Sequence, residues 1–195
     1  AGQLVDALLD PMQHPLVRRR LPLVLARSDS RLAIVGLTAG LDSPDWNTRF
    51  RCAQALQTIH STHPGARIDE TLLLSHAEKQ ARIIAGGPHA QPVGDPRLQF
   101  VFYLFGAVYD PETLDLCWRA VQSGDRAARG TALEYLENRV PMEIWALLQP
   151  ILAPGHVKPK DRRSLNRIAQ DLFAHAKSLG PTRQGSDDAT AEIVD

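Results

Sequence analysis

Apolar residues recur along this chain at the spacing of α-helices. Leu32, Val35, Leu37 and Leu41, for example, form the stripe of a helix and do not alternate with polar residues as they would in a strand. Segments of this kind follow one another in pairs, separated by short turns rich in Asp, Ser, Pro and Gly. The pattern therefore predicts an all-α protein built from helical hairpins.

Turn residues and helix caps set the predicted boundaries. We predict helices over residues 3–9, 14–27, 31–41, 46–60, 69–85, 98–105, 111–122, 126–138, 141–151 and 161–179. Asp29 or Ser30, Asp45 and Asp110 stand where N-caps are expected. The segment 98–105 is apolar nearly all round, which is typical of a central, buried helix. The longest internal loop is predicted over Gly86–Pro96.

An arginine followed seven residues later by a leucine occurs in four of these helices, and the position three after each arginine is apolar. The pairs are Arg18–Leu25, Arg49–Leu56, Arg97–Leu104 and Arg129–Leu136, with Leu21, Cys52, Phe100 and Ala132 between them. Successive arginines are 31, 48 and 32 residues apart, which is the length of a helical hairpin or of a hairpin with an insertion. We therefore predict a right-handed α-solenoid of about five hairpins over residues 1–179, with the last helix as its C-terminal cap and the four leucines buried. Residues 180–195 are small and polar, so we expect a disordered tail.

Charge and cysteine content narrow the range of functions. Lys plus Arg and Asp plus Glu each number 22, so the formal net charge is zero, whereas nucleic-acid-binding proteins usually carry a basic excess. Cys52 and Cys117 fall in apolar helical patterns, which favours buried thiols in a reducing, cytoplasmic compartment. No apolar run is long enough to span a membrane, and no signal peptide is visible. Because the chain begins at Ala1 and not at Met, we interpret it as a processed product or a fragment of a longer protein.

Two segments of the chain align without a gap at an offset of 80 residues. They are GLDSPDWNTRFRCAQAL and VQSGDRAARGTALEYL, and they resemble the HEAT-repeat family. The resemblance extends over about residues 1–152 and implies stacked helical hairpins. It also implies a ladder between repeats, formed by a turn aspartate and an arginine at the start of the second helix. Asp45 with Arg49, and Asp125 with Arg129, occupy the matching positions.

A narrower likeness concerns the segments VRRRLPLVLARSDS and RGTALEYLENRVP. They look like the HEAT-type segment at the C-terminus of some bacterial membrane transporters of the nucleotide-antiporter kind. This likeness implies a soluble regulatory domain of a larger membrane protein. Pro22 departs from the general pattern, because a proline inside a helix removes a backbone hydrogen bond and bends the helix.

Candidate chemistry in the sequence is sparse, and two interpretations remain for each candidate. His60 and His63 could begin a metal site, but no further ligand cluster lies nearby in sequence. Glu134 and Glu137 could act as acid and base, but no nucleophile or phosphate-binding loop accompanies them. The four register arginines could bind phosphate, or they could bond turn aspartates and cap the preceding helices. We therefore expect no enzyme activity and no cofactor.

A set of side chains at the same helical positions is the predicted binding surface. Positions one, two and five after each register arginine turn away from the core. The predicted partner-binding residues are Arg19, Arg20, Phe50, Arg51, Gln54, Gln99, Thr131 and Glu134, with Gly130 on the same strip. Phe50 is the expected exposed anchor beside Arg51.

The function that fits this surface is a non-catalytic interaction or scaffolding module. Its partner is expected to be another protein, another domain of the parent chain, or a second copy of the chain. The alternative is a HEAT-type nucleic-acid-binding protein or DNA glycosylase, which holds DNA in a basic groove; the neutral charge disfavours this alternative.

Overall fold

The computed structural model describes residues 1–28, 30–87, 93–153 and 163–176, and all regular structure in this part of the chain is helical. The helices are α1 (Gly2–Leu9), α2 (Pro15–Leu25), α3 (Arg31–Gly40), α4 (Trp46–Thr62), α5 (Glu70–Ala85), α6 (Pro96–Val108), α7 (Pro111–Gln122), α8 (Arg126–Arg139), α9 (Met142–Leu152) and α10 (Leu165–Ala176). The prediction of an all-α protein is confirmed, and the helix boundaries lie close to those predicted. The predicted tail, 180–195, and part of the predicted loop, 88–92, lie outside the described residues.

Six consecutive helices begin at a serine or aspartate whose side chain accepts a hydrogen bond from the first turn, and α2 before them begins at His14, whose Nδ1 accepts from the Leu16 N–H. This satisfies backbone N–H groups that have no partner within the helix. The caps are Ser30 for α3, Asp45 for α4, Asp69 for α5, Asp95 for α6, Asp110 for α7 and Asp125 for α8. Ser30, Asp45 and Asp110 were predicted from the sequence, whereas Asp29 lies outside the described residues.

The apolar register of the sequence corresponds to the core. Leu25, Leu56, Leu104 and Leu136 are at most 1% exposed. The apolar residues three after each arginine, Leu21, Cys52, Phe100 and Ala132, are buried as well. They belong to one continuous cluster that runs from Val5 to Leu172. The prediction that these leucines are buried is confirmed.

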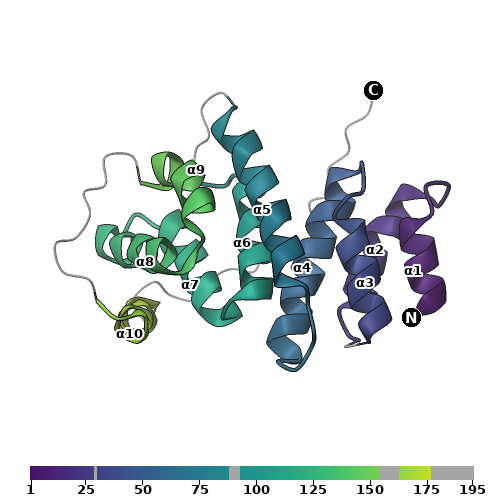
Figure 1. Ribbon diagram of the computed structural model, residues 1–195, viewed down its shortest axis with the longest axis horizontal. Helices are drawn as coiled ribbons and strands as arrows, with labels where there is room; N and C mark the ends of the chain where they lie inside the picture. The colour runs from purple at the N-terminus through teal and green to yellow at the C-terminus, as the bar shows by residue number, and fades with distance from the viewer. Residues whose placement is uncertain (29, 88–92, 154–162, 177–195) are drawn as a thin grey trace.

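The first six helices pack as neighbouring hairpins (Figure 1). Helix α1 lies against α3, and α2, α4 and α6 follow one another in a second row. Helix α5 packs on α6 and on α9, α6 also packs on α7, and α10 lies against α7 and α8. In the view of Figure 1, α8 lies across the direction of α1–α6, so the molecule changes direction after α6. A right-handed solenoid of five hairpins stays a prediction.

The close packing of α4 on α3 and on α6 depends on glycine residues. A Cβ atom added to Gly40 of α3 would lie 2.5 Å from Sγ of Cys52 in α4. One added to Gly106 of α6 would lie 2.7 Å from Nε2 of Gln57 in α4. Both distances are far shorter than any real contact, so glycine sets how closely α4 approaches its two neighbours.

The register arginines stabilise helix ends and turns. Arg18 donates to the carbonyl of Leu8 (3.3 Å) and to Oγ of Ser43 (3.0 Å). Arg49 donates to the carbonyls of Ser43 and Pro44. Arg97 pairs with Asp95, and Arg129 donates to the carbonyl of Leu152 (2.8 Å). Of the two interpretations left open by the sequence, bonds to turns and helix ends are therefore the ones observed.

Candidate functional site

Helices α4 and α6 bring four of the predicted partner-binding residues together. Phe50, Arg51 and Gln54 come from α4, and Gln99 comes from α6, which packs directly beside it. Tyr103, one turn after Gln99, completes the group and was missed in the sequence. We call these five residues the α4–α6 face. Each of these side chains is partly exposed, so the face is accessible to a partner.

Aromatic contacts fix the centre of the α4–α6 face. The ring of Phe50 lies 6.0 Å from that of Trp46 and 5.3 Å from that of Tyr103, in an edge-to-face arrangement with the tyrosine. The ring of Trp46 in turn lies 5.4 Å from that of buried Phe100. Phe50 is therefore partly buried against the core, and the expectation of a freely exposed Phe50 is wrong. The rings form a row that leads from the core to the surface.

Polar contacts orient the side chains around this row. Arg51 Nη1 donates to Oε1 of Gln54 (3.0 Å), and Gln99 Nε2 donates to the hydroxyl of Tyr103 (3.0 Å). Burial raises the pKa of Tyr103, while the nearby positive charge of Arg51 lowers this pKa and the negative charge of Asp115 in α7 raises it. The phenol is therefore neutral near pH 7 and can both donate and accept a hydrogen bond.

Arg19 and Arg20 lie on α2, in the same row of helices as α4. Arg20 is exposed, as predicted. Arg19 makes two hydrogen bonds to the carboxylate of Asp45, with Nη2 to Oδ1 at 2.9 Å. These bonds and those from Thr48 hold the pKa of Asp45 well below its usual range. Arg19 therefore links α2 to the start of α4, and its side chain is not free to bind a partner. The resemblance to HEAT repeats instead implied that Asp45 pairs with Arg49.

Thr131 and Glu134 do not belong to any exposed face. They are 6% and 4% exposed, so the prediction that they line a binding surface is wrong. The hydroxyl of Thr131 donates to the carbonyl of Ala127 (3.1 Å). The carboxylate of Glu134 accepts two hydrogen bonds from Nε of Arg163, at 3.0 and 3.2 Å, and a further one from Nη2. Helix α10 and the residues just before it cover this side of α8.

The other candidates of the sequence have structural contacts. His60 Nδ1 lies 3.0 Å from the carbonyl of Gly106, which joins α4 to α6. His63 instead contacts its neighbour Thr62. Within the described residues, no group of three or more His, Cys, Asp or Glu side chains could hold a metal ion. Cys52 and Cys117 are buried free thiols, and burial raises the pKa of Cys52 to about 12.

Comparisons with protein-family models, with curated proteins and with solved structures gave no match. None of the helices over residues 1–28, 30–87, 93–153 and 163–176 has the length and apolar character needed to cross a membrane.

Proposed function

We propose that this chain is a non-catalytic interaction module that binds a protein partner through the α4–α6 face. The partner is a separate protein or another domain of the parent chain. The observation that carries the proposal is the aromatic row from Phe100 to Tyr103, which ends at the surface beside Arg51. The few residues that contribute most of the binding energy in protein interfaces are enriched in Trp, Tyr and Arg.

The contacts within the α4–α6 face suit recognition. Phe50 is held by Trp46 and Tyr103, and Tyr103 is held by Phe50 and Gln99, so little side-chain entropy is lost when a partner covers them. Gln54, Gln99 and the tyrosine hydroxyl supply neutral donors and acceptors at the rim. Arg51 adds a positive charge that favours an acidic group on the partner.

An exposed apolar stripe on α2 also supports an interaction role. Leu16, Leu23 and Val24 are 61%, 48% and 51% exposed, and their spacing places them along one side of the helix. A stripe of this kind on a soluble surface is typical of a contact with another protein segment.

The architecture that we propose with this function is a right-handed HEAT-type α-solenoid of about five hairpins. The successive packing of α2, α4 and α6, and of α1 on α3, supports it. The likeness to the HEAT-type segment of nucleotide-antiporter-like transporters belongs to the same proposal, with the parent transporter as one source of the partner. The place of action on this proposal is the cytoplasm.

Site-specific cross-linking in the host cell tests the proposal. A photoreactive residue is placed at Gln54, on the α4–α6 face, and at Val35, which is 56% exposed on α3, as a control. We expect one defined cross-linked protein from position 54 and none from position 35. Adding Arg51→Glu should abolish the cross-link, whereas Arg82→Glu on α5 should leave it unchanged. Equal cross-linking from both positions, or no effect of Arg51→Glu, would contradict the proposal.

The alternative of a nucleic-acid-binding protein or glycosylase is less well supported. Its candidate carboxylate, Glu134, is buried and paired with Arg163, and the charge of Arg19 is neutralised by Asp45. We expect no tight binding of a fluorescent DNA duplex in anisotropy titrations at physiological salt. A sub-micromolar affinity that falls steeply with added salt would favour the alternative.

A further inference from the structure

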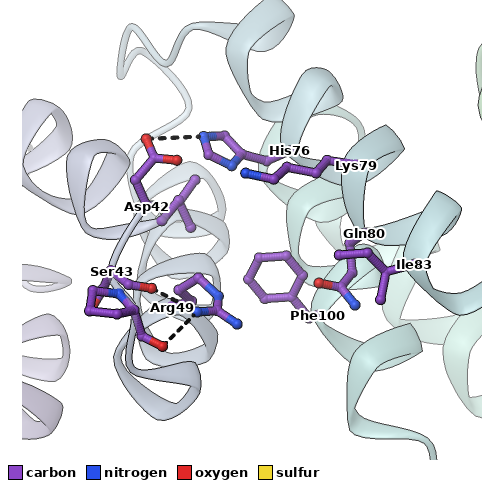
Figure 2. Close-up of a pocket in the computed structure, with 10 residues that line it drawn as sticks. Asp42, Ser43, Arg49, His76, Lys79, Gln80, Ile83 and Phe100 are labelled. Carbon is purple, nitrogen blue, oxygen red and sulfur yellow. Dashed lines mark hydrogen bonds and ion pairs between the residues drawn. The ribbon is translucent and has the colours of Figure 1, made fainter.

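A cavity of about 260 Å³ lies between the α3–α4 turn and helix α5. None of the five residues of the α4–α6 face lines it, although Phe100 belongs both to the cavity and to the aromatic row behind that face. Helix α3 packs mainly on α1 and α4, whereas α5 packs mainly on α6 and α9, and the cavity lies between these two sets of contacts. Figure 2 shows Phe100 of α6 in the middle of it, with Arg49 on one side and Gln80 on the other. Of its lining residues, the sequence pointed only to Arg49, as one of four arginines that could bind phosphate, because periodicity does not show how α4, α5 and α6 meet around a cavity.

Two cations reach the cavity without a carboxylate partner. Arg49 Nη1 donates to the backbone carbonyls of Ser43 (2.7 Å) and Pro44 (3.0 Å), which fixes the guanidinium in place. The other end of the guanidinium points across the cavity in Figure 2. Lys79 extends from α5 toward the same space. Over the described residues, neither Arg49 nor Lys79 forms an ion pair with an acidic side chain.

A buried amide on α5 has no hydrogen-bond partner among the residues that the structure describes. Gln80 is only 8% exposed and lines the cavity, yet its side chain makes no hydrogen bond to any described residue. Leaving such a group unsatisfied destabilises the folded protein. A buried amide that lines a cavity and has no partner among the described residues needs a partner from outside the chain, and a bound ligand can supply it.

The remaining walls indicate which ligand fits. Phe100, Leu41 and Ile83 provide an apolar wall. His76 stands at the entrance, with Nε2 3.9 Å from Oδ2 of Asp42, and burial is the main cause that lowers its pKa. The carboxylate of Asp42 is 69% exposed at the same entrance and disfavours a doubly charged anion. The backbone N–H groups of Ser43 and Asp45, which would cradle a phosphate, are already bonded within the turn.

We propose that this cavity binds a small organic monocarboxylate. Its carboxylate pairs with Arg49 and Lys79, its hydrocarbon part packs on Phe100, and Gln80 bonds a polar atom of the ligand. The volume is below that of sites for drug-sized molecules, so the ligand is small. The same chemistry is present in a free organic acid and in the C-terminal carboxylate of a peptide chain.

Calorimetry and saturation-transfer NMR on the full chain test the proposal with matched probes. Benzoate and isobutyrate are compared with benzamide and isobutyramide, which have the same shapes without the charge. An Ala-Phe dipeptide with a free C-terminus is compared with its amide, and inorganic phosphate is included. We expect a carboxylate to bind at least tenfold more tightly than its amide. Binding of benzoate or isobutyrate identifies a free acid as the source, and binding of the dipeptide alone identifies a chain end.

Variants then assign the binding to this cavity. Lys79→Gln and Gln80→Leu should each weaken carboxylate binding about tenfold. Arg82→Gln, which removes a cation on the same helix that is already paired with Glu78, should leave it unchanged. Gln80→Leu should also raise the melting temperature of the free protein, because it removes an unpaired buried amide. Equal binding of acids and amides, binding of phosphate alone, or carboxylate binding that Lys79→Gln and Gln80→Leu leave intact would overturn the proposal.

Discussion

At the scale of single residues, burial and pairing separate positions that the sequence makes look equivalent. Arg51 and Thr131 both stand two positions after a register arginine, yet Arg51 is partly exposed and Thr131 is buried. Gln54 and Glu134 differ in the same way five positions after the arginine. Helical periodicity correctly gives the side of the helix on which a residue lies. It does not indicate that α10 covers that side of α8, because this contact joins distant parts of the chain.

The Arg19–Asp45 pair should stabilise the protein in a pH-dependent way. The hydrogen bonds from Arg19 lower the pKa of Asp45 in the folded protein, so the pair contributes its full stability above the unfolded pKa of about 3.9. This contribution is lost as the pH falls below that value toward the lower folded pKa. We expect Asp45→Asn, which retains an N-cap, to lower the free energy of unfolding at pH 7 but progressively less below pH 4, measured by urea unfolding.

Asp45→Ala is the comparison for this experiment. It removes the N-cap of α4 as well as the ion pair, so it should cost about 1 kcal/mol more than Asp45→Asn. A difference between wild type and Asp45→Asn that grows as the pH falls from 4 to 2 would show that the charge of Asp45 does not stabilise the fold.

The Arg163–Glu134 pair should respond unequally to loss of its two partners. The side chain of Glu134 is 5% exposed, whereas that of Arg163 is 40% exposed and also pairs with Asp171. Arg163→Ala leaves a buried carboxylate unpaired and should cost about 3 kcal/mol. Glu134→Gln leaves an arginine that still has Asp171 and water, so we expect a clearly smaller loss. Thermal unfolding of both variants at pH 7 measures these two losses of stability. Equal losses for Arg163→Ala and Glu134→Gln would contradict this account.

At the scale of helices, local sequence determines most of what is observed. Aspartate or serine caps begin six helices, and the stripe of leucines faces the core in each second helix of the first four hairpins. Both signals lie within one or two turns of the chain, which is why the ten helices could be predicted. The predicted bend at Pro22 has a local cause too, since this proline lies inside α2 and removes one of its hydrogen bonds.

Truncating a register leucine should destabilise the protein strongly. Leu56 of α4 and Leu104 of α6 are 0% exposed. Their two helices pack extensively on each other and on further helices. We expect Leu56→Ala and Leu104→Ala each to cost about 2–5 kcal/mol, because the cavity is only partly refilled. Leu32→Ala in α3, which is 49% exposed, is the matched control and should cost much less. Similar melting temperatures for all three variants and the wild type would show that the register is wrong.

At the scale of the whole molecule, the order of packing could not be predicted from the sequence. Periodicity indicates hairpins. It does not show that α5 packs on α9 or that the chain changes direction after α6 (Figure 1). Such choices depend on which surfaces fit best over long distances in the chain. The cavity lined by Arg49 and Gln80 depends on the same choices, since its walls come from the α3–α4 turn and from α4, α5 and α6.

The same packing predicts that the chain unfolds as one unit. In a regular repeat array each hairpin contacts only its neighbours, and distant hairpins can unfold separately. Here α5 packs on α9, and α6 packs on both α4 and α7, so the first and last helices share one continuous core. We expect a single urea transition, with far-UV circular dichroism and tryptophan fluorescence coinciding. Leu25→Ala in α2 and Leu136→Ala in α8 should both shift its midpoint. Two separate transitions, only one of which responds to Leu136→Ala, would mean that the helices after α6 form an independent unit.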